Sequence, residues 1–172
     1  MKFRLAFLFV FGLASLLEAA EGARLEKNCR MFTAKVNVAY TTDNCTSPIG
    51  LCTKGKIYGD PILYGTTGYV VEKVAGSAED PTMAASLVYS GTMKITTQYG
   101  VITVTDLGTL DKTTGLNSSQ SRAVSGQYKN SKVSGVFFTA GAAEATGAGI
   151  NSSAFGQLCF EKAAGTSEPF LN

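Results

Sequence analysis

The sequence of 172 residues contains no histidine. Without histidine the chain cannot build a serine–histidine triad or an HExxH metal site, and it lacks the side chain that most often acts as a general base. It also has no GxxxxGK[ST] or GxGxxG element, so no phosphate-binding loop is predicted. These absences argue against the best-known hydrolase and nucleotide-binding classes, and we expect no cofactor and no metal ion.

Charge is scarce as well, because charged residues make up 16% of the chain, and the net charge of +2 involves no basic run. We therefore expect no nucleic-acid partner and no binding to an anionic membrane surface. What is abundant is typical of β-proteins: 45% hydrophobic residues, 19 glycines, and many Thr, Ser, Val and Tyr. The composition predicts a globular all-β protein.

The N-terminal segment reads Met-Lys-Phe-Arg followed by LAFLFVFGLASLL. A basic start and an apolar run too short to cross a bilayer are typical of a secretion signal. Ala20 and Gly22 provide the small residues that cleavage requires, so we expect a signal peptide at residues 1–22 and one domain at residues 23–172; an uncleaved anchor is the alternative. No second apolar run predicts a membrane span, and the expected location is secreted or periplasmic.

All four cysteines follow the expected cleavage site, and an oxidising compartment favours disulfides over free thiols. Cys45 and Cys52 flank the segment TSPIGL, which suits a turn, so we expect these two to pair locally. Cys29 then pairs with Cys159, joining the first strand to the last. The alternative is a zinc site, which normally needs a second cysteine cluster or histidine.

Strand patterns recur between turn signals, with no helical period of useful length after the N-terminal segment. The expected strands are residues 31–40, 51–59, 62–76, 84–97, 101–110, 121–129, 132–141 and 154–161. Eight strands with short connections predict an antiparallel up-and-down, calycin-like β-barrel, or else a sandwich. The longest loops are expected at residues 76–82, with a turn of helix, and 143–153.

Alternation within residues 91–106 predicts which side chains share a face. If Tyr99-Gly100 is a two-residue turn with Gly100 at positive φ, Ile95 faces Val104 and Met93 faces Asp106. The inner face then carries Met93, Ile95, Thr97, Ile102, Val104 and, by parity, Asp106.

The next hairpin is expected to turn at Asn130-Ser131. Its predicted inner pairs are Tyr128 with Val133 and Val124 with Phe137. Because Phe137 and Phe138 are consecutive, one of the two rings must point outward. We therefore expect a loop or a partner to cover part of the outer surface.

The order YSGTMKITTQYGVITVTDLGTLD, then VSGQYKNSKVSGVFFTAG, then FGQLCFE resembles a group of secreted proteins related to allene oxide cyclase and dirigent-type barrels. In that group a glycine and a nearby aromatic residue precede a strand and further glycines, and Gly126, Tyr128, Gly135 and Gly141 stand in those places here. The resemblance covers residues 51–161. It implies an eight-stranded barrel with an apolar interior, and it transfers no catalytic residue to this chain.

Inside such a barrel we expect a ligand to be lined by Met93, Ile95, Ile102, Val104, Tyr128 and Phe137. Asp106 is the candidate catalytic residue, because an inward carboxylate in an apolar barrel has a raised pKa and can act as an acid or a base. The alternative, which we favour from the sequence, places Asp106 at the rim, hydrated or bonded to loop amides, with a pKa near or below the ordinary value.

Three N-x-S/T sequons begin at Asn44, Asn117 and Asn151, all in expected loops, where glycosylation would fit in a eukaryotic host. The leading functional hypothesis is a secreted barrel that binds a small apolar ligand or serves as a structural module. The alternatives are a cyclase or isomerase of the allene oxide cyclase or dirigent type, which steers its substrate by shape, and an extracellular interaction protein. A wide cavity with a buried acid favours the enzyme, whereas a filled interior favours the structural module.

Overall fold

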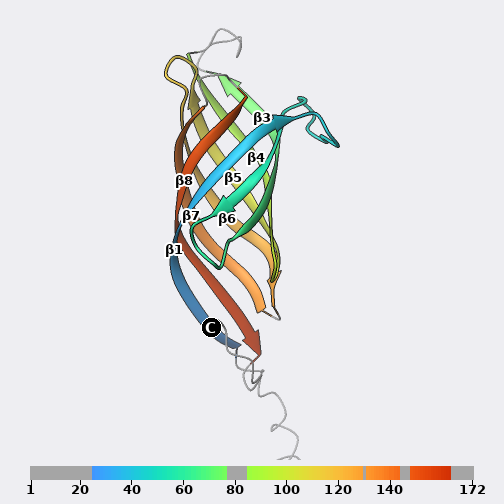
Figure 1. Cartoon of the computed structure of the whole chain (residues 1–172), viewed down its shortest axis with the longest axis vertical. Helices are drawn as coiled ribbons and strands as arrows, with labels where there is room; N and C mark the ends of the chain where they lie inside the picture. Colours follow the sequence, from blue (N-terminus) through green and yellow to red (C-terminus); the bar gives the residue numbers. More distant parts are fainter. Residues whose placement is uncertain (1–24, 77–84, 130, 144–147, 164–172) are drawn as a thin grey trace, which may run out of the picture.

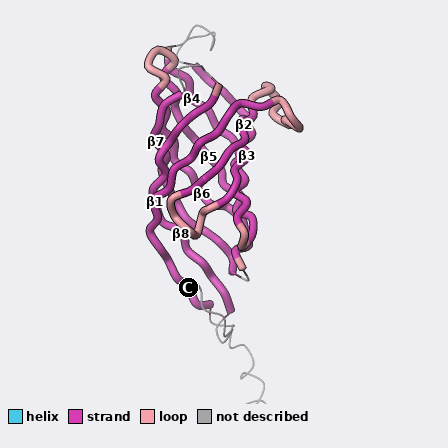
Figure 2. The backbone as a smooth tube through the Cα atoms, viewed as in Figure 1, coloured by secondary structure: helices cyan, strands magenta, loops and turns pink. Residues whose placement is uncertain are grey.

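The computed structural model describes residues 25–76, 85–129, 131–143 and 148–163, and the strands within them form one closed sheet. The strands are β1 (Leu25–Thr41), β2 (Cys52–Tyr58), β3 (Gly65–Gly76), β4 (Ser86–Thr97), β5 (Gly100–Asp111), β6 (Leu116–Tyr128), β7 (Ser131–Ala143) and β8 (Gly149–Ala163). Each strand pairs antiparallel with the next, and β8 pairs with β1 to close the barrel (Figures 1 and 2). No helix within the described ranges is long and apolar enough to span a membrane.

All eight expected strands are present, but their ends differ from the sequence prediction. β1 and β8 pair from Leu25 opposite Ala163 to Ala39 opposite Gly149, and their ends extend beyond the other strands in Figure 1. The loop expected at residues 143–153 is therefore wrong for residues 149–153, which form strand. Cross-strand bonds explain the difference, because Lys35 donates from Nζ to Ser153 Oγ at 2.8 Å and Asn37 donates to the Asn151 amide oxygen. The expected signal peptide and most of the expected loop at 76–82 lie outside the described residues.

The hairpin of β4 and β5 turns at Gln98-Tyr99, so the predicted turn at Tyr99-Gly100 is wrong. Thr97 pairs with Gly100, and Asp106 lies opposite Gly91 instead of Met93. The Thr97 hydroxyl explains the position of the turn, because it accepts from the Tyr99 N–H at 3.1 Å and donates to the Gly100 carbonyl at 3.2 Å. A shift of two residues keeps every side chain on its face. The predicted inner residues Met93, Ile95, Thr97, Ile102 and Val104 are accordingly all buried.

In the hairpin of β6 and β7, strand β6 contains a bulge that the sequence did not reveal. Tyr128 pairs with Ser131 rather than Val133, and the pairing of β6 with both neighbours shifts by one residue near Val124. Because one extra residue reverses the alternation, Val124 is 52% exposed, and Ser121 lies opposite Phe137. The prediction that Val124 faces the interior is therefore wrong, and the inward positions 117, 119 and 121 of β6 are polar.

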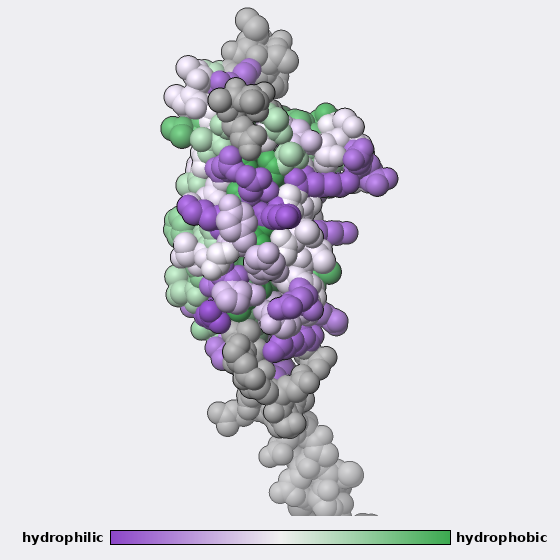
Figure 3. All heavy atoms as spheres, viewed as in Figure 1, coloured by the Kyte–Doolittle hydropathy of each residue, from purple (hydrophilic) through white to green (hydrophobic). Residues whose placement is uncertain are grey.

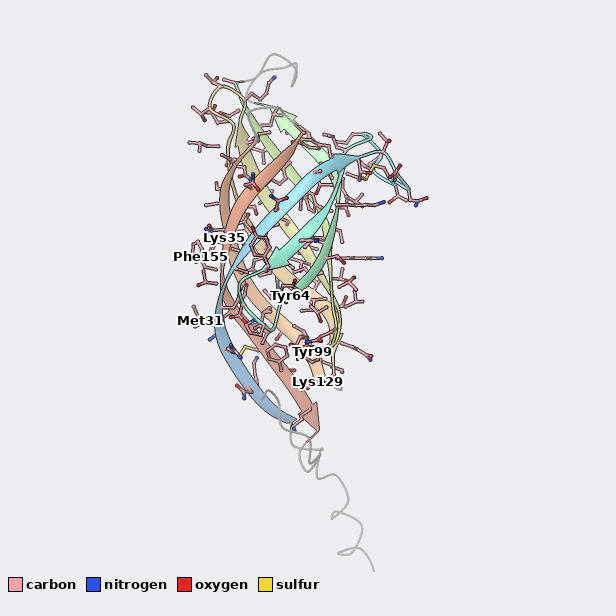
Figure 4. All side chains as sticks on the ribbon, viewed as in Figure 1. Met31, Lys35, Tyr64, Tyr99, Lys129 and Phe155 are labelled. Atoms are coloured by element: carbon pink, nitrogen blue, oxygen red, sulfur yellow. A yellow bond between two sulfur atoms is a disulfide. The ribbon has the colours of Figure 1, made fainter. Side chains whose placement is uncertain are left out.

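One end of the barrel, called here the closed half, is filled by side chains. Ile62 and Leu63 were expected in a strand, but they lie in the turn between β2 and β3 and are buried. Asp60 holds this turn, because its carboxylate accepts from the Ile62 N–H at 3.0 Å and lies 3.6 Å from Arg30. Figure 4 shows Tyr99 and Lys129 near the same end, where the Lys129 ammonium lies 5.0 Å from the Tyr99 ring centre. The buried side chains filling this half are Phe32, Ala34, Ile57, Ile62, Leu63, Ile95, Ile102, Val104, Ala123, Tyr128, Val133, Phe137, Ala154, Leu158 and Phe160.

Both predicted disulfides are confirmed. Cys29 and Cys159 face each other directly across β1 and β8, and Cys45–Cys52 closes the connection between β1 and β2. The described residues contain no free cysteine. Two disulfides indicate an oxidising, extracellular compartment.

The outer surface carries several large apolar side chains among hydrophilic ones (Figure 3). Phe137 points into the barrel, whereas Phe138 points outward and stacks on Phe155 with ring centres 5.8 Å apart. Figure 4 shows Phe155 and Met31 on the outside of the barrel. Both stacked phenylalanines are exposed, so coverage by a loop or a partner stays a prediction.

Candidate functional site

The half of the barrel opposite the closed half contains a pocket of about 140 Å³. We call it the open half. The pocket draws its lining from all eight strands and from the residue before β2. The lining residues are Val36, Val38, Tyr40, Leu51, Thr53, Tyr69, Val71, Val74, Leu87, Tyr89, Met93, Asp106, Leu110, Asn117, Ser119, Ser121, Thr139, Ile150 and Ser152.

Only Met93 of the predicted ligand-lining residues contacts this pocket. The other five, Ile95, Ile102, Val104, Tyr128 and Phe137, point inward as expected but fill the closed half. Alternation therefore predicted the direction of these side chains correctly. Alternation does not predict how far along the barrel axis a side chain lies, and that position determines whether the side chain belongs to the core or to the pocket.

The pocket has one polar wall, formed mainly by β6. Asn117, Ser119 and Ser121 point inward at alternate positions of this strand. Ser119 Oγ lies 2.6 Å from Thr139 Oγ1 on β7, and Ser152 of β8 donates to the Asn117 side-chain oxygen at 3.4 Å. Sequence reasoning missed this wall because it treated residues 116–120 as loop. No alternation was present to reveal the strand, because residues 117–122 are all polar.

Placement of Asn117 in this wall corrects the glycosylation prediction. Its side chain is 9% exposed and faces the pocket from a strand, so it is not a surface loop site. Asn151 also lies in a strand, β8, although its side chain is exposed. Asn44 lies exposed in the connection after β1, with φ of 51°. Glycosylation at Asn44 remains a prediction that this placement permits.

Asp106 lies in the pocket wall between β4 and β6. Ser121 is its direct partner across the strands, and the Ser121 hydroxyl donates to Asp106 Oδ1 at 2.5 Å. Burial raises the pKa of the Asp106 carboxyl, while hydrogen bonds from Ser121, Ser119 and Tyr69 act in the opposite direction. The favoured placement at the rim, bonded to loop amides, is therefore wrong: the carboxylate is part-buried and its partners are hydroxyl groups.

Two tyrosines pack edge to face beside this carboxylate. The ring centres of Tyr69 and Tyr89 are 6.2 Å apart. Glycines make room for them, because a Cβ atom at Gly91 would lie 2.8 Å from the Tyr69 hydroxyl oxygen and one at Gly108 would lie 2.4 Å from that of Tyr89. The sheet thus brings two phenol groups and one carboxylate to the same region of the pocket.

The two phenol groups differ in their partners. The Tyr89 hydroxyl bonds to Ser119 and Asn117, and burial, followed by the charge of Asp106, raises the pKa of Tyr89 to about 12. The Tyr69 hydroxyl is buried without a well-formed hydrogen bond, although it faces Asp106. Burial, and then the charge of Asp106, also raises the pKa of Tyr69. The pocket therefore contains one phenol oxygen with unused hydrogen-bonding capacity.

The remaining carboxylates near these strands have other surroundings. Glu72 is exposed and accepts a hydrogen bond from Thr92 Oγ1 at 2.7 Å. Asp111 accepts from the Thr113 and Thr114 N–H groups at 2.8 and 2.9 Å, which fixes the turn before β6. No group of three or more Cys, Asp or Glu side chains suited to a metal ion occurs in the described part of the chain.

No protein-family model, no curated protein and no solved structure matches this chain. The resemblance to the allene oxide cyclase and dirigent-type barrels therefore stays a prediction, and the functional argument depends on the geometry of the pocket alone.

Proposed function

We propose that this protein is a secreted barrel that binds a small, mainly apolar ligand in the pocket of the open half. The observation that carries the proposal is the unequal filling of the two halves: packed side chains occupy the closed half, whereas the open half contains a pocket, although barrels of eight strands are narrow enough for side chains to fill. Small-molecule sites are typically concave and apolar with a few polar groups, as this pocket is. Its volume of about 140 Å³ is close to that of an engineered cavity of about 150 Å³ that accepts benzene.

Secretion is part of this proposal. The signal peptide expected at residues 1–22 supplies the export step, and the two disulfides support an extracellular destination. The resemblance to dirigent-type barrels adds a precedent for an apolar barrel interior. It identifies neither a ligand nor a reaction for this chain.

Toluene titrated into methyl-labelled protein tests the binding function by NMR. We expect shifts at Met93, Val71 and Leu87, which line the pocket, and none at Ile102 in the closed half. Val71→Phe should block binding because residue 71 lines the cavity, whereas Val101→Phe adds the same group on the outer surface and should not. Absence of shifts at the pocket methyls, or shifts that survive Val71→Phe, would contradict the proposal.

A second candidate function is an isomerase or cyclase, favoured by one observation. The Asp106 carboxyl lies part-buried in the wall of a mainly apolar pocket, and burial raises its pKa, so the group can donate a proton to a substrate at moderately acid pH. Such a group can isomerise a small epoxide: the Asp106 proton goes to the ring oxygen as one C–O bond breaks, a hydride shifts to the cationic carbon to give an aldehyde, and the carboxylate takes the proton back. Incubation with styrene oxide, followed by chromatography of the products, tests it: Asp106→Asn should bind toluene normally and lose turnover. Equal turnover by the variant would exclude Asp106 as the acid.

A further inference from the structure

We propose that the pocket is selective for a small amine, whose protonated amino group binds the Asp106 carboxylate while its apolar body contacts the opposite wall. This inference rests on the proposed binding function and adds the chemical class of the ligand. It starts from a charge in the pocket wall that lacks a counter-charge.

Among the described residues that line the pocket, Asp106 is the one that carries a charge. The described part of the lining includes no Lys or Arg. The Ser121 hydroxyl donates to Asp106, and the hydroxyls of Ser119 and Tyr69 face the same carboxylate. Arg122, next to Ser121 on β6, is exposed and borders a pocket on the outer surface that Asp106 also lines, but the ion pairs of the described residues do not include one between these two side chains. Buried charges in proteins are normally paired, so a ligand cation would supply the missing partner.

The hydrogen-bonding groups around Asp106 match an ammonium group. A carboxylate offers about four acceptor sites, and hydroxyls occupy only part of them, which leaves acceptors for a ligand N–H. The Tyr69 hydroxyl oxygen has no well-formed partner and lies beside the carboxylate, so it provides a further acceptor. The edge-to-face rings of Tyr69 and Tyr89 add aromatic surface of the kind that attracts cations.

Other ligand classes fit less well. An anionic ligand would place a second negative charge beside Asp106, and a neutral alcohol would leave the carboxylate without a counter-charge. Across the barrel from Asp106, β1 and β8 contribute the aliphatic side chains Val36, Val38 and Ile150 to the pocket, which suits the apolar body of an amine. Burial raises the pKa of Asp106, and a bound cation would favour the charged form again, so amine binding should release the proton that Asp106 carries at acid pH.

Four ligands that share one ring provide the test: benzylamine, benzyl alcohol, toluene and benzoate, each titrated calorimetrically into the intact protein near neutral pH. We expect benzylamine to bind about tenfold or more tightly than benzyl alcohol, as a charge-assisted hydrogen bond in a part-buried site allows, and benzoate to bind most weakly. Asp106→Asn should reduce benzylamine to the level of benzyl alcohol while leaving toluene binding unchanged.

Glu72→Gln is the matched control, because it removes an exposed carboxylate on β3 that does not line the pocket. The preference for benzylamine should survive this change, and its loss would show a general charge effect and overturn the inference. Tyr69→Phe is a second test, which does not depend on the folding of the Asp106 variant. It removes the free acceptor of the Tyr69 hydroxyl and should weaken the binding of benzylamine several-fold more than that of toluene.

The outcomes separate the inference from the proposed function. If toluene and benzyl alcohol bind in the pocket but benzylamine binds no better, the amine inference is wrong and the binding function stands. If none of the four ligands binds, the binding function is wrong and the inference fails with it.

Discussion

The closed and open halves of this barrel are built on the same strands but filled differently. On β1 the inward residues change from Phe32 in the closed half to Val36 and Val38 in the open half. On β6 they change from Tyr128 to Ser121 and Asn117. The same eight strands continue from one half to the other, and the pairing of β6 shifts by one residue at the bulge near Val124. On β1 and β6 the cavity therefore arises because smaller or polar inward side chains in the open half replace the aromatic ones of the closed half.

The two halves also differ in how their polar groups are satisfied. In the closed half, apart from the unpartnered Tyr128 hydroxyl, the buried groups are almost all apolar, and aromatic rings contact one another, as with Phe32 and Phe137 at 5.5 Å between ring centres. In the open half a carboxylate and three inward polar side chains of β6 face the pocket. Stability is therefore expected to depend mainly on the closed half, and ligand choice on the open half. The predictions below test this division.

Removing the two disulfides in turn gives the largest expected contrast. Cys29–Cys159 closes a separation of 130 residues, whereas Cys45–Cys52 closes 7. In the chain-entropy model the double variant Cys29→Ser/Cys159→Ser loses about 5 kcal/mol of unfolding free energy, and Cys45→Ser/Cys52→Ser about 2.5 kcal/mol. Urea denaturation of both double variants measures the difference. Equal losses would show that loop length does not set the stabilisation here.

Truncating one isoleucine in each half compares core with pocket. Ile102 is fully buried in the closed half, so Ile102→Ala should cost about 2–5 kcal/mol because it leaves a cavity among packed neighbours. Ile150 is only half-buried and already borders the pocket, so Ile150→Ala should cost less than half as much. Chemical denaturation of the two variants measures the loss of unfolding free energy in each. A cost at residue 150 equal to that at 102 would contradict the division.

Gly100 begins β5 near the closed end, and its φ of +146° is one that other residues rarely adopt. A Cβ atom there would lie 2.0 Å from the Gln127 carbonyl oxygen. Gly100→Val should therefore cost at least about 1 kcal/mol and lower the melting temperature. Gly68→Val is the control, because no atom lies within 4 Å of the corresponding Cβ position and φ is not positive there. If both variants melt alike, the close contact at Gly100 does not exist in solution.

The sequence predicted the sides of the sheet better than positions along it. An error of two residues in the hairpin of β4 and β5 left Met93, Ile95 and Ile102 on the inner face, because side chains alternate with a period of two. The extra residue at Val124 had the opposite effect and reversed the alternation before it. A bulge depends on pairing with both neighbouring strands, so the local pattern of β6 did not contain it.

The site was harder to predict than the fold for a related reason. Strand recognition relied on apolar alternation, and the polar wall at Asn117, Ser119 and Ser121 has none, so these residues resembled a loop. The disulfide pairs could be predicted because a turn between Cys45 and Cys52 left only one partner for Cys29. The parity of Asp106 was correct, but its burial depended on hydroxyl partners that lie on a different strand.

The smallest expected effect concerns two aspartates of β5 with opposite surroundings. Burial raises the pKa of Asp106 in the pocket wall. Backbone hydrogen bonds, first from Thr114 and also from Thr113, hold the pKa of Asp111 at the end of the strand below its ordinary value. A group whose pKa is raised in the folded protein contributes stability that is complete below about pH 3.8 and is lost as the pH rises through the raised pKa. A group whose pKa is lowered contributes stability that is complete above about pH 3.8 and is lost as the pH falls through the lowered pKa.

The variants Asp106→Asn and Asp111→Asn should therefore respond to pH with opposite signs. Relative to the parent protein, Asp106→Asn should be more stable at pH 7 than at pH 3, because it removes an ionisation that the pocket disfavours while the amide oxygen still accepts from Ser121. Asp111→Asn should show its largest loss at pH 7 and a smaller one at pH 3. Thermal denaturation between pH 3 and 8 measures both differences, and other ionisable groups cancel in the comparison. If Asp106→Asn instead became relatively less stable as the pH rose, the Asp106 carboxylate would be stabilised in the folded protein, and its need for a ligand cation would be refuted.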